Sequence, residues 1–217
     1  METLIVSRTK FGQQRCIGGI ILDQMKSVRL VQKDGSYWPD SSPLKVGGIW
    51  NLELQECASH EPPFFENVIA LKGKQLREID SIRNFLIANK EHQHLEPIFW
   101  EGSVKDLYEG KVNFQSSNSR AFISVGNEPT MSTGFWTPSK DLVLQADKKH
   151  YQYITLANYM GFEVQEIQEI AYVGEDAPLQ TIPAGSLCRV SLAKPIKPHP
   201  DFEGPNRLYV QLSGWYL

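Results

Sequence analysis

The chain has 217 residues, of which 41% are hydrophobic, 22% are charged and 11% are aromatic, and its formal net charge is −3. These values are those of a globular protein, and they exclude a disordered chain. No stretch approaches the roughly 18 apolar residues of a membrane span, and the first residues lack the apolar core of a signal peptide, so we expect a cytoplasmic protein without membrane association.

The first third of the chain has the pattern of a small β-barrel. Short runs of β-branched and aliphatic residues alternate with turn-rich segments, and the alternation of apolar and polar residues is typical of strands with one buried face. Gly18 and Gly19 lie inside the second run, where glycines often mark a bulge or a sharp bend of a barrel. Five strands within about 70 residues fit a small barrel. They are predicted at 3–7, 15–22, 27–32, 49–58 and 60–71.

One helix is predicted after these strands. Apolar side chains recur with helical spacing over residues 75–90, and no Gly or Pro interrupts the pattern. The region 95–140 contains many turn residues and shows no clear period, so we assign no regular element to it. Strand patterns return in the last third, at 151–156, 163–174, 186–193 and 207–217.

These patterns predict a mostly β protein that consists of two small barrels joined by one helix and an irregular segment. The predicted division is 1–74 for the first barrel, 75–140 for the linking helix with an irregular or strand-bearing segment, and 141–217 for the second barrel.

Catalytic and metal-binding signatures are weak. The sequence has no GxSxG, HExxH, P-loop or GxGxxG motif. His92 and His94 could bind a metal if they lay on a strand, but no further ligands are recognisable. His60 and Glu66 could carry out acid–base chemistry, although a hydrogen bond in a turn explains them equally well. We therefore predict a protein that is not an enzyme and that needs no cofactor, and keep a metal-dependent hydrolase as an alternative.

The three cysteines are predicted to be reduced. Cys16, Cys57 and Cys188 are far apart, and none belongs to a CxxC pair. Arg15 could lower the pKa of the neighbouring Cys16 thiol, but the apolar surroundings of Cys16 in a strand favour an inert side chain.

Basic residues gather at the two ends of the chain. Residues 1–33 contain six Lys or Arg and two acids, residues 185–217 contain four and two, and the segment between them contains twelve and twenty-one. If the ends lie side by side they form one positive face, although both signs could equally mix on the surface.

Small barrels bind single-stranded nucleic acid through cations that follow the backbone and aromatic rings that stack on bases. The basic ends supply such cations, and rings such as Tyr37, Trp38 and Trp136 lie in or near turn-rich segments. Each ring could instead fill a core. The predicted nucleic-acid-binding residues are Arg8, Lys10, Arg15, Arg29, Trp38, Trp136, Arg189, Lys194, Arg207 and Trp215.

Segments of both halves match a known family in their order and spacing. They are LIVSRTKFGQQRCIGGI, SVRLV and HEPPFFENVI, followed by STGFWTP, AGSLCRVSL and RLYVQLSGWYL. With these segments the chain resembles the dual OB-domain proteins of bacteria over nearly its whole length, from Thr3 to Tyr216. The resemblance implies two OB folds in tandem, which are five-stranded Greek-key barrels that commonly bind oligonucleotides. It also implies an association with helicases and nucleases in bacterial defence or mobile-element gene clusters.

We therefore predict an accessory module that binds single-stranded DNA or RNA in such a system. The first alternative is an adaptor that binds a helicase or nuclease partner, which the acidic middle of the chain favours because it would repel a nucleic acid.

Overall fold

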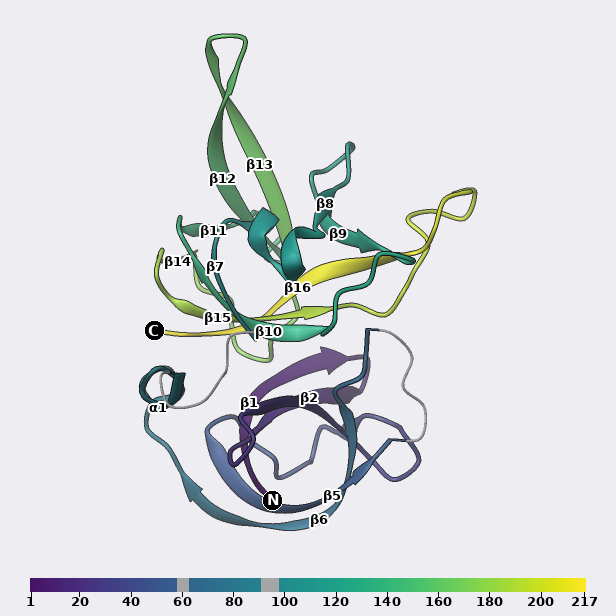
Figure 1. The fold of residues 1–217 in the computed structure, drawn as a ribbon, viewed down its shortest axis with the longest axis vertical. Coiled ribbons are helices and arrows are strands. Elements are labelled where there is room, and N and C mark those ends of the chain that lie inside the picture. Colours follow the sequence, from purple (N-terminus) through teal and green to yellow (C-terminus); the bar gives the residue numbers. More distant parts are fainter. Residues whose placement is uncertain (58–62, 91–97) are drawn as a thin grey trace.

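The computed structural model describes residues 1–57, 63–90 and 98–217, and it shows two β-units packed against each other (Figure 1). His60, His92 and His94 lie outside the described residues. The first sheet consists of β1 (Glu2–Phe11), β2 (Gln14–Ile21), β3 (Lys26–Val31), β4 (Trp38–Pro39), β5 (Gly48–Glu56) and β6 (Asn67–Glu78).

Five strands of the first unit close into a barrel in the order β1–β2–β3–β6–β5–β1. β3 and β6 run parallel, and the other neighbours run antiparallel. This is the Greek-key order of an OB fold. The five predicted strands are therefore confirmed, because their alternation places residues such as Val28, Leu30 and Leu52 in the barrel core.

The glycine pair in β2 marks a close approach of two strands. The pairing of β1 with β2 shifts register between Ile5 and Ser7, whose partners are Gly19 and Gly18. A Cβ atom at Gly18 would lie 2.5 Å from Oγ of Ser7, and one at Gly19 would lie 2.8 Å from Cγ2 of Thr3. A side chain at either position would require the facing side chain of β1 to shift, and the predicted bulge lies opposite the two glycines in β1.

The second unit repeats the same strand order. β10 and β11 are separated by three residues and together act as its first strand, because β10 pairs with β15 and β11 pairs with β12. The remaining neighbours are β12–β13, β13–β16 in parallel, and β16–β15. The chain is therefore a tandem of two OB folds. The elements of the second unit are β7 (Phe99–Gly102), η2 (Val104–Asp106), η3 (Tyr108–Gly110), β8 (Asn113–Phe114), β9 (Ala121–Ser124), β10 (Thr133–Pro138), β11 (Leu142–Leu144), β12 (His150–Tyr159), β13 (Phe162–Tyr172), β14 (Thr181–Ile182), β15 (Leu187–Leu192) and β16 (Arg207–Tyr216).

The segment between the two predicted barrels differs from its prediction. The helix α1 spans Ile82–Lys90 and not the whole of 75–90. Residues 75–78 continue β6, because they pair with residues 48–50 of β5, and this tertiary pairing outweighs local helical periodicity. Within the region taken as irregular, β7 and β10 pair in parallel, and β9 pairs with β16. These short strands belong to the second sheet.

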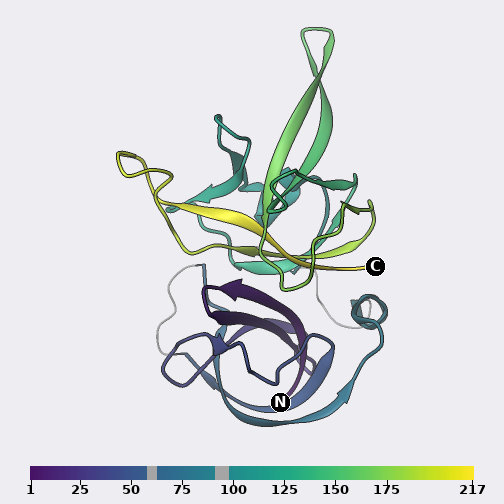
Figure 2. The same ribbon diagram turned by 180° about the vertical axis from the view of Figure 1, so that it is seen from behind.

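The two barrels share a packed interface. The outer face of β1, β2 and β3 lies against β10, β15 and β16, with Leu4 and Ile20 of the first barrel in one cluster with Phe135 and Leu187 of the second. Figure 2 shows the same stacking from behind. The backbone N–H of Lys10 donates to the carbonyl of Val173 across the interface, at 3.1 Å. OB folds commonly bind oligonucleotides on the face formed by their second and third strands. In the first barrel, this face is therefore covered by the second barrel.

Among the residues that the structure describes, no helix has the length and apolar character needed to cross a membrane.

Candidate functional site

A pocket lies between the two barrels. Its volume is about 110 Å³, and it is lined from one side by β1, β2 and β3 and from the other by β10, β15 and β16. We call it the inter-barrel pocket. Four of the predicted binding residues line it, namely Lys10, Arg29, Arg189 and Lys194, and no acidic residue is among the described residues that do. Both basic ends of the chain thus contribute to one site.

The mouth of the pocket combines cations with aromatic rings. Lys10 and Lys194 are exposed there, and Nζ of Lys194 lies 5.5 Å from the ring centre of Phe11 and 5.2 Å from that of Tyr37. The two rings meet edge to face at 5.0 Å, and Phe11 is 50% exposed. Phe11 precedes the β1–β2 turn of the first barrel and Lys194 follows β15 of the second. These are the loop positions at which OB folds bind oligonucleotides.

Two buried arginines line the interior of the pocket. Arg29 lies 3.5 Å from Glu66 and donates to Oγ of Ser132 at 3.0 Å. Arg189 donates to Oγ of Ser27 at 2.7 Å and stacks over the Phe135 ring at 4.7 Å. Arg29 therefore has a carboxylate partner, whereas within the described chain no carboxylate lies at ion-pair distance from Arg189.

Burial disfavours the charged form of both guanidinium groups, with different results. It lowers the pKa of Arg189. For Arg29, Cys16 and Glu66 together outweigh the effect of burial, and the pKa is raised. The thiol of Cys16 lines the pocket beside Arg29, whereas Cys188 is buried in the second core, where burial raises its pKa to about 12.

Arg8 and Arg15 lie beside the pocket, but their charges are already paired. The buried Arg8 donates to the carbonyl of Leu44 at 3.1 Å and forms an ion pair with Glu175 at 2.9 Å. Arg15 lies 2.7 Å from Asp40 and 3.6 Å from Glu175. Both side chains tie the segment between β4 and β5 to the segment after β13, so they join the barrels.

The other predicted residues also lie outside the inter-barrel pocket. Trp136 is fully buried in the second core, and its Nε1 donates to the carbonyl of Gly102 at 3.2 Å. Nε1 of the half-buried Trp38 donates to the carbonyl of Leu30 at 3.0 Å. The side chains of Arg207 and Trp215 each pack against two rings, Phe122 and Phe202 for Arg207, and Tyr151 and Tyr172 for Trp215.

Sequence reasoning did not select Phe11, and it named Tyr37 without including it in the predicted set. The signal for Phe11 was its place directly before Gly12, which has a φ of +59°, because an aromatic residue at a tight turn is poorly placed to reach a core. The pocket also contains hydroxyl groups from both barrels, such as those of Ser7 and Ser191. The sequence positions of these serines did not indicate that they would line the pocket.

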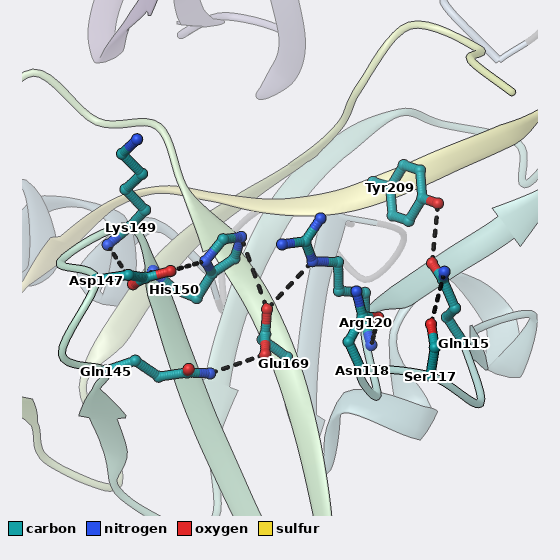
Figure 3. A network of polar contacts seen from close by, with 10 residues as sticks. All are labelled: Gln115, Ser117, Asn118, Arg120, Gln145, Asp147, Lys149, His150, Glu169 and Tyr209. Atoms are coloured by element: carbon teal, nitrogen blue, oxygen red, sulfur yellow. Dashed lines mark hydrogen bonds and ion pairs between the residues drawn. The ribbon is translucent and has the colours of Figure 1, made fainter. Parts of the chain in front are cut away.

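A second polar network holds the base of the β12–β13 hairpin (Figure 3). Glu169 accepts hydrogen bonds from Nε2 of Gln145 at 2.8 Å and from Nε of Arg120 at 3.2 Å, and Nε2 of His150 lies 3.7 Å away. Nδ1 of His150 lies 2.5 Å from Asp147, and this bond, with a backbone N–H bond from Lys149, lowers the pKa of Asp147. The network fixes two connecting segments to β13.

In the described part of the chain, no group of three or more His, Cys, Asp or Glu could hold a metal ion. Of the residues considered for acid–base chemistry, Glu66 is buried and bonded to Ser132 and Arg29. It therefore acts as the counter-charge of Arg29.

Comparison with known proteins agrees with the architecture. A family model described as a dual OB-containing domain matches residues 1–215. Searches of curated proteins and of solved structures gave no match. The matched range includes both barrels and the pocket between them.

Proposed function

Because the chain belongs to the family of dual OB-containing domains, we propose that it is a binding module that holds single-stranded nucleic acid at the mouth of the inter-barrel pocket. The observation that supports this most is the grouping of Lys10, Lys194, Phe11 and Tyr37 at OB ligand loops, next to a pocket without lining acids. The proposal extends to a role as an accessory module in bacterial defence or mobile-element systems, which rests on the family resemblance alone.

In this mechanism the cations and rings have separate roles. Lys10 and Lys194 contact phosphates of the backbone, and Phe11 or Tyr37 stacks on an unpaired base. A duplex keeps its bases stacked inside the helix, so it offers phosphates to the lysines but no base to the rings. Single strands are therefore the preferred ligand.

The outer surfaces of the two barrels restrict where the strand can lie. The strand 2–3 face of the first barrel is covered by the second, as described above. The corresponding face of the second barrel lies on β12 and β13, where residues 150–172 contain three glutamates and no Lys or Arg. Two of these glutamates are paired with cations, Glu166 with Lys105 and Glu169 with Arg120. This face therefore offers phosphates little free positive charge, and the mouth of the inter-barrel pocket is the more favourable position.

Fluorescence polarisation with labelled single-stranded DNA, single-stranded RNA and duplex tests this function. We expect binding to both single strands that weakens about 10-fold between 50 and 200 mM salt, as two or three phosphate contacts would give. A labelled duplex of equal length is the matched ligand control, and we expect it to bind more weakly. An affinity that does not change with salt, or no binding to any of the three at low salt, contradicts the proposal.

The β12–β13 hairpin favours a second candidate function, the binding of a protein partner. The hairpin extends away from the first barrel (Figures 1 and 2), and we call its outer part, residues 154–167, the distal ribbon. Leu156 and Phe162 are 63% and 74% exposed. Beyond residue 153, β12 has no partner among the described strands except β13. Such an uncharged edge can accept an extended strand of a partner.

Co-expression with the product of an adjacent helicase or nuclease gene tests this adaptor function. We expect co-purification that is lost in a Leu156→Lys/Phe162→Lys variant, because the strand register places these two exposed side chains on opposite faces of the distal ribbon, so that both faces gain charge. A Lys72→Glu/Lys74→Glu variant, altered on the first barrel, is the matched control and should still co-purify. Equal recovery of the partner with both variants excludes the ribbon as the docking site.

A further inference from the structure

Arg189 is a buried cation for which the described residues supply no carboxylate at ion-pair distance. Its side chain is 1% exposed, its Nη1 atom has no hydrogen-bond partner, and its charged form is disfavoured by burial. Ser27 and the Phe135 ring are its polar and aromatic contacts. Burying an unpaired charge costs several kcal/mol. A side chain in this position is stabilised when an anion reaches it.

The inter-barrel pocket gives an anion access to Arg189. Arg189 lines the pocket together with the hydroxyl-bearing Ser7, Ser191 and Ser213. The hydroxyls of Ser191 and Ser213 lie 2.7 Å apart and share one hydrogen bond, so Ser7 and one member of this pair can donate to an oxyanion. Space beside the guanidinium depends on Gly18, since a Cβ atom there would lie 3.6 Å from Nη2 of Arg189 and 2.5 Å from Oγ of Ser7. The interior of the pocket thus places hydroxyl donors around the guanidinium of Arg189.

The size of the pocket limits what can enter it. Pockets for drug-sized ligands have volumes of roughly 300–1,000 Å³, whereas this pocket has a volume of about 110 Å³. A phosphate group fits such a space, but a whole nucleotide does not. At an internal phosphate, the nucleic-acid strand continues on both sides. A terminal phosphate is therefore easier to hold in the space between the two barrels.

We infer that the inter-barrel pocket binds a terminal phosphate of the nucleic-acid strand, with Arg189 as its counter-charge, so that the protein recognises the end of the strand. A terminal phosphate has a charge of about −1.5 to −2 and three free oxygens. It therefore matches an arginine surrounded by hydroxyl donors better than an internal phosphodiester with a single charge does. This inference rests on the proposed function, and it adds which part of the nucleic-acid strand the protein recognises.

The test compares one labelled single strand with a 5′-phosphate, a 3′-phosphate or hydroxyl groups at both ends, with the label placed internally. We expect one phosphorylated form to bind about 10- to 100-fold more tightly than the hydroxyl form, as one or two hydrogen bonds to charged groups would give. In Arg189→Met this preference should disappear, while the hydroxyl-ended strand still binds through Lys10 and Lys194. Gly18→Ala, which fills the space beside Arg189, should give the same loss and serves if Arg189→Met does not fold.

Inorganic phosphate is the second probe, read as a shift in the melting temperature of the full chain. A shift that Gly18→Ala removes, together with the preference for one phosphorylated end, supports the inference. Equal binding of phosphorylated and hydroxyl strands overturns it and leaves the proposed function standing. A phosphate-induced shift without binding of any strand assigns the pocket to free phosphate and overturns both.

Discussion

Reversing the two lysines at the mouth of the pocket, in a Lys10→Glu/Lys194→Glu variant, is expected to weaken single-strand binding on the order of 100-fold. Both side chains are exposed and neither forms an ion pair in the described structure, so the change should leave the fold intact. Each hydrogen bond to a phosphate contributes roughly 1.5–3 kcal/mol. Losing two such contacts therefore gives a factor of about 100 or more, which fluorescence polarisation at low salt measures.

A control with the same change in net charge separates local contacts from the overall field. In Lys72→Glu/Lys74→Glu the two lysines lie on β6, at the side of the first barrel that faces away from the second (Figure 1). We expect this variant to lose only a few-fold in affinity, because neither lysine lines the inter-barrel pocket and salt screens exposed charges over about 10 Å at 0.1 M. Similar losses in both variants would mean that no strand lies at the mouth of the pocket.

Arg8→Met is expected to lower the free energy of unfolding by about 2–4 kcal/mol, because a buried carbonyl left without its donor costs roughly 1–3 kcal/mol. The Arg8 side chain is fully buried, and its removal leaves the buried carbonyls of Ser42 and Leu44 without this donor, while Glu175 keeps Arg15 as a partner. The segment after β4 and the contact between the barrels should both loosen. Urea denaturation, analysed with the slope of each transition, measures the change.

Arg15→Met is the matched variant for this prediction, because Arg15 shares Asp40 and Glu175 with Arg8. The side chain of Asp40 is 66% exposed, so water screens the Arg15–Asp40 pair and we expect a loss of about 1 kcal/mol or less. If Arg8→Met proves as mild as Arg15→Met, and instead weakens nucleic-acid binding, Arg8 is a ligand contact and not a structural one.

Local sequence patterns were sufficient for most of the strands. The alternation around Val28, Leu30 and Leu52 identifies strands with one buried face, and the two glycines of β2 indicate a close approach. Where pairing depends on distant residues, the patterns failed. Residues 75–78 have helical spacing but pair with β5. β7 has only four residues, and β10 is buried along nearly its whole length, so it has no exposed face to alternate with a buried one.

The sequence by itself determined that this chain forms strands in both its first and its last third and carries basic residues at both ends, because strand alternation and charge are properties of neighbouring positions. Only the tertiary structure decided which cations are available to a ligand. Arg8 and Arg15 are paired with acids. Arg189, more than 150 residues from its partner Ser27, has no acid partner among the residues that the structure describes. Trp136 likewise lies in a core and Phe11 at the mouth of the pocket. Charge compensation and burial depend on which distant segments meet, and the packing of the two barrels alone brings these segments together.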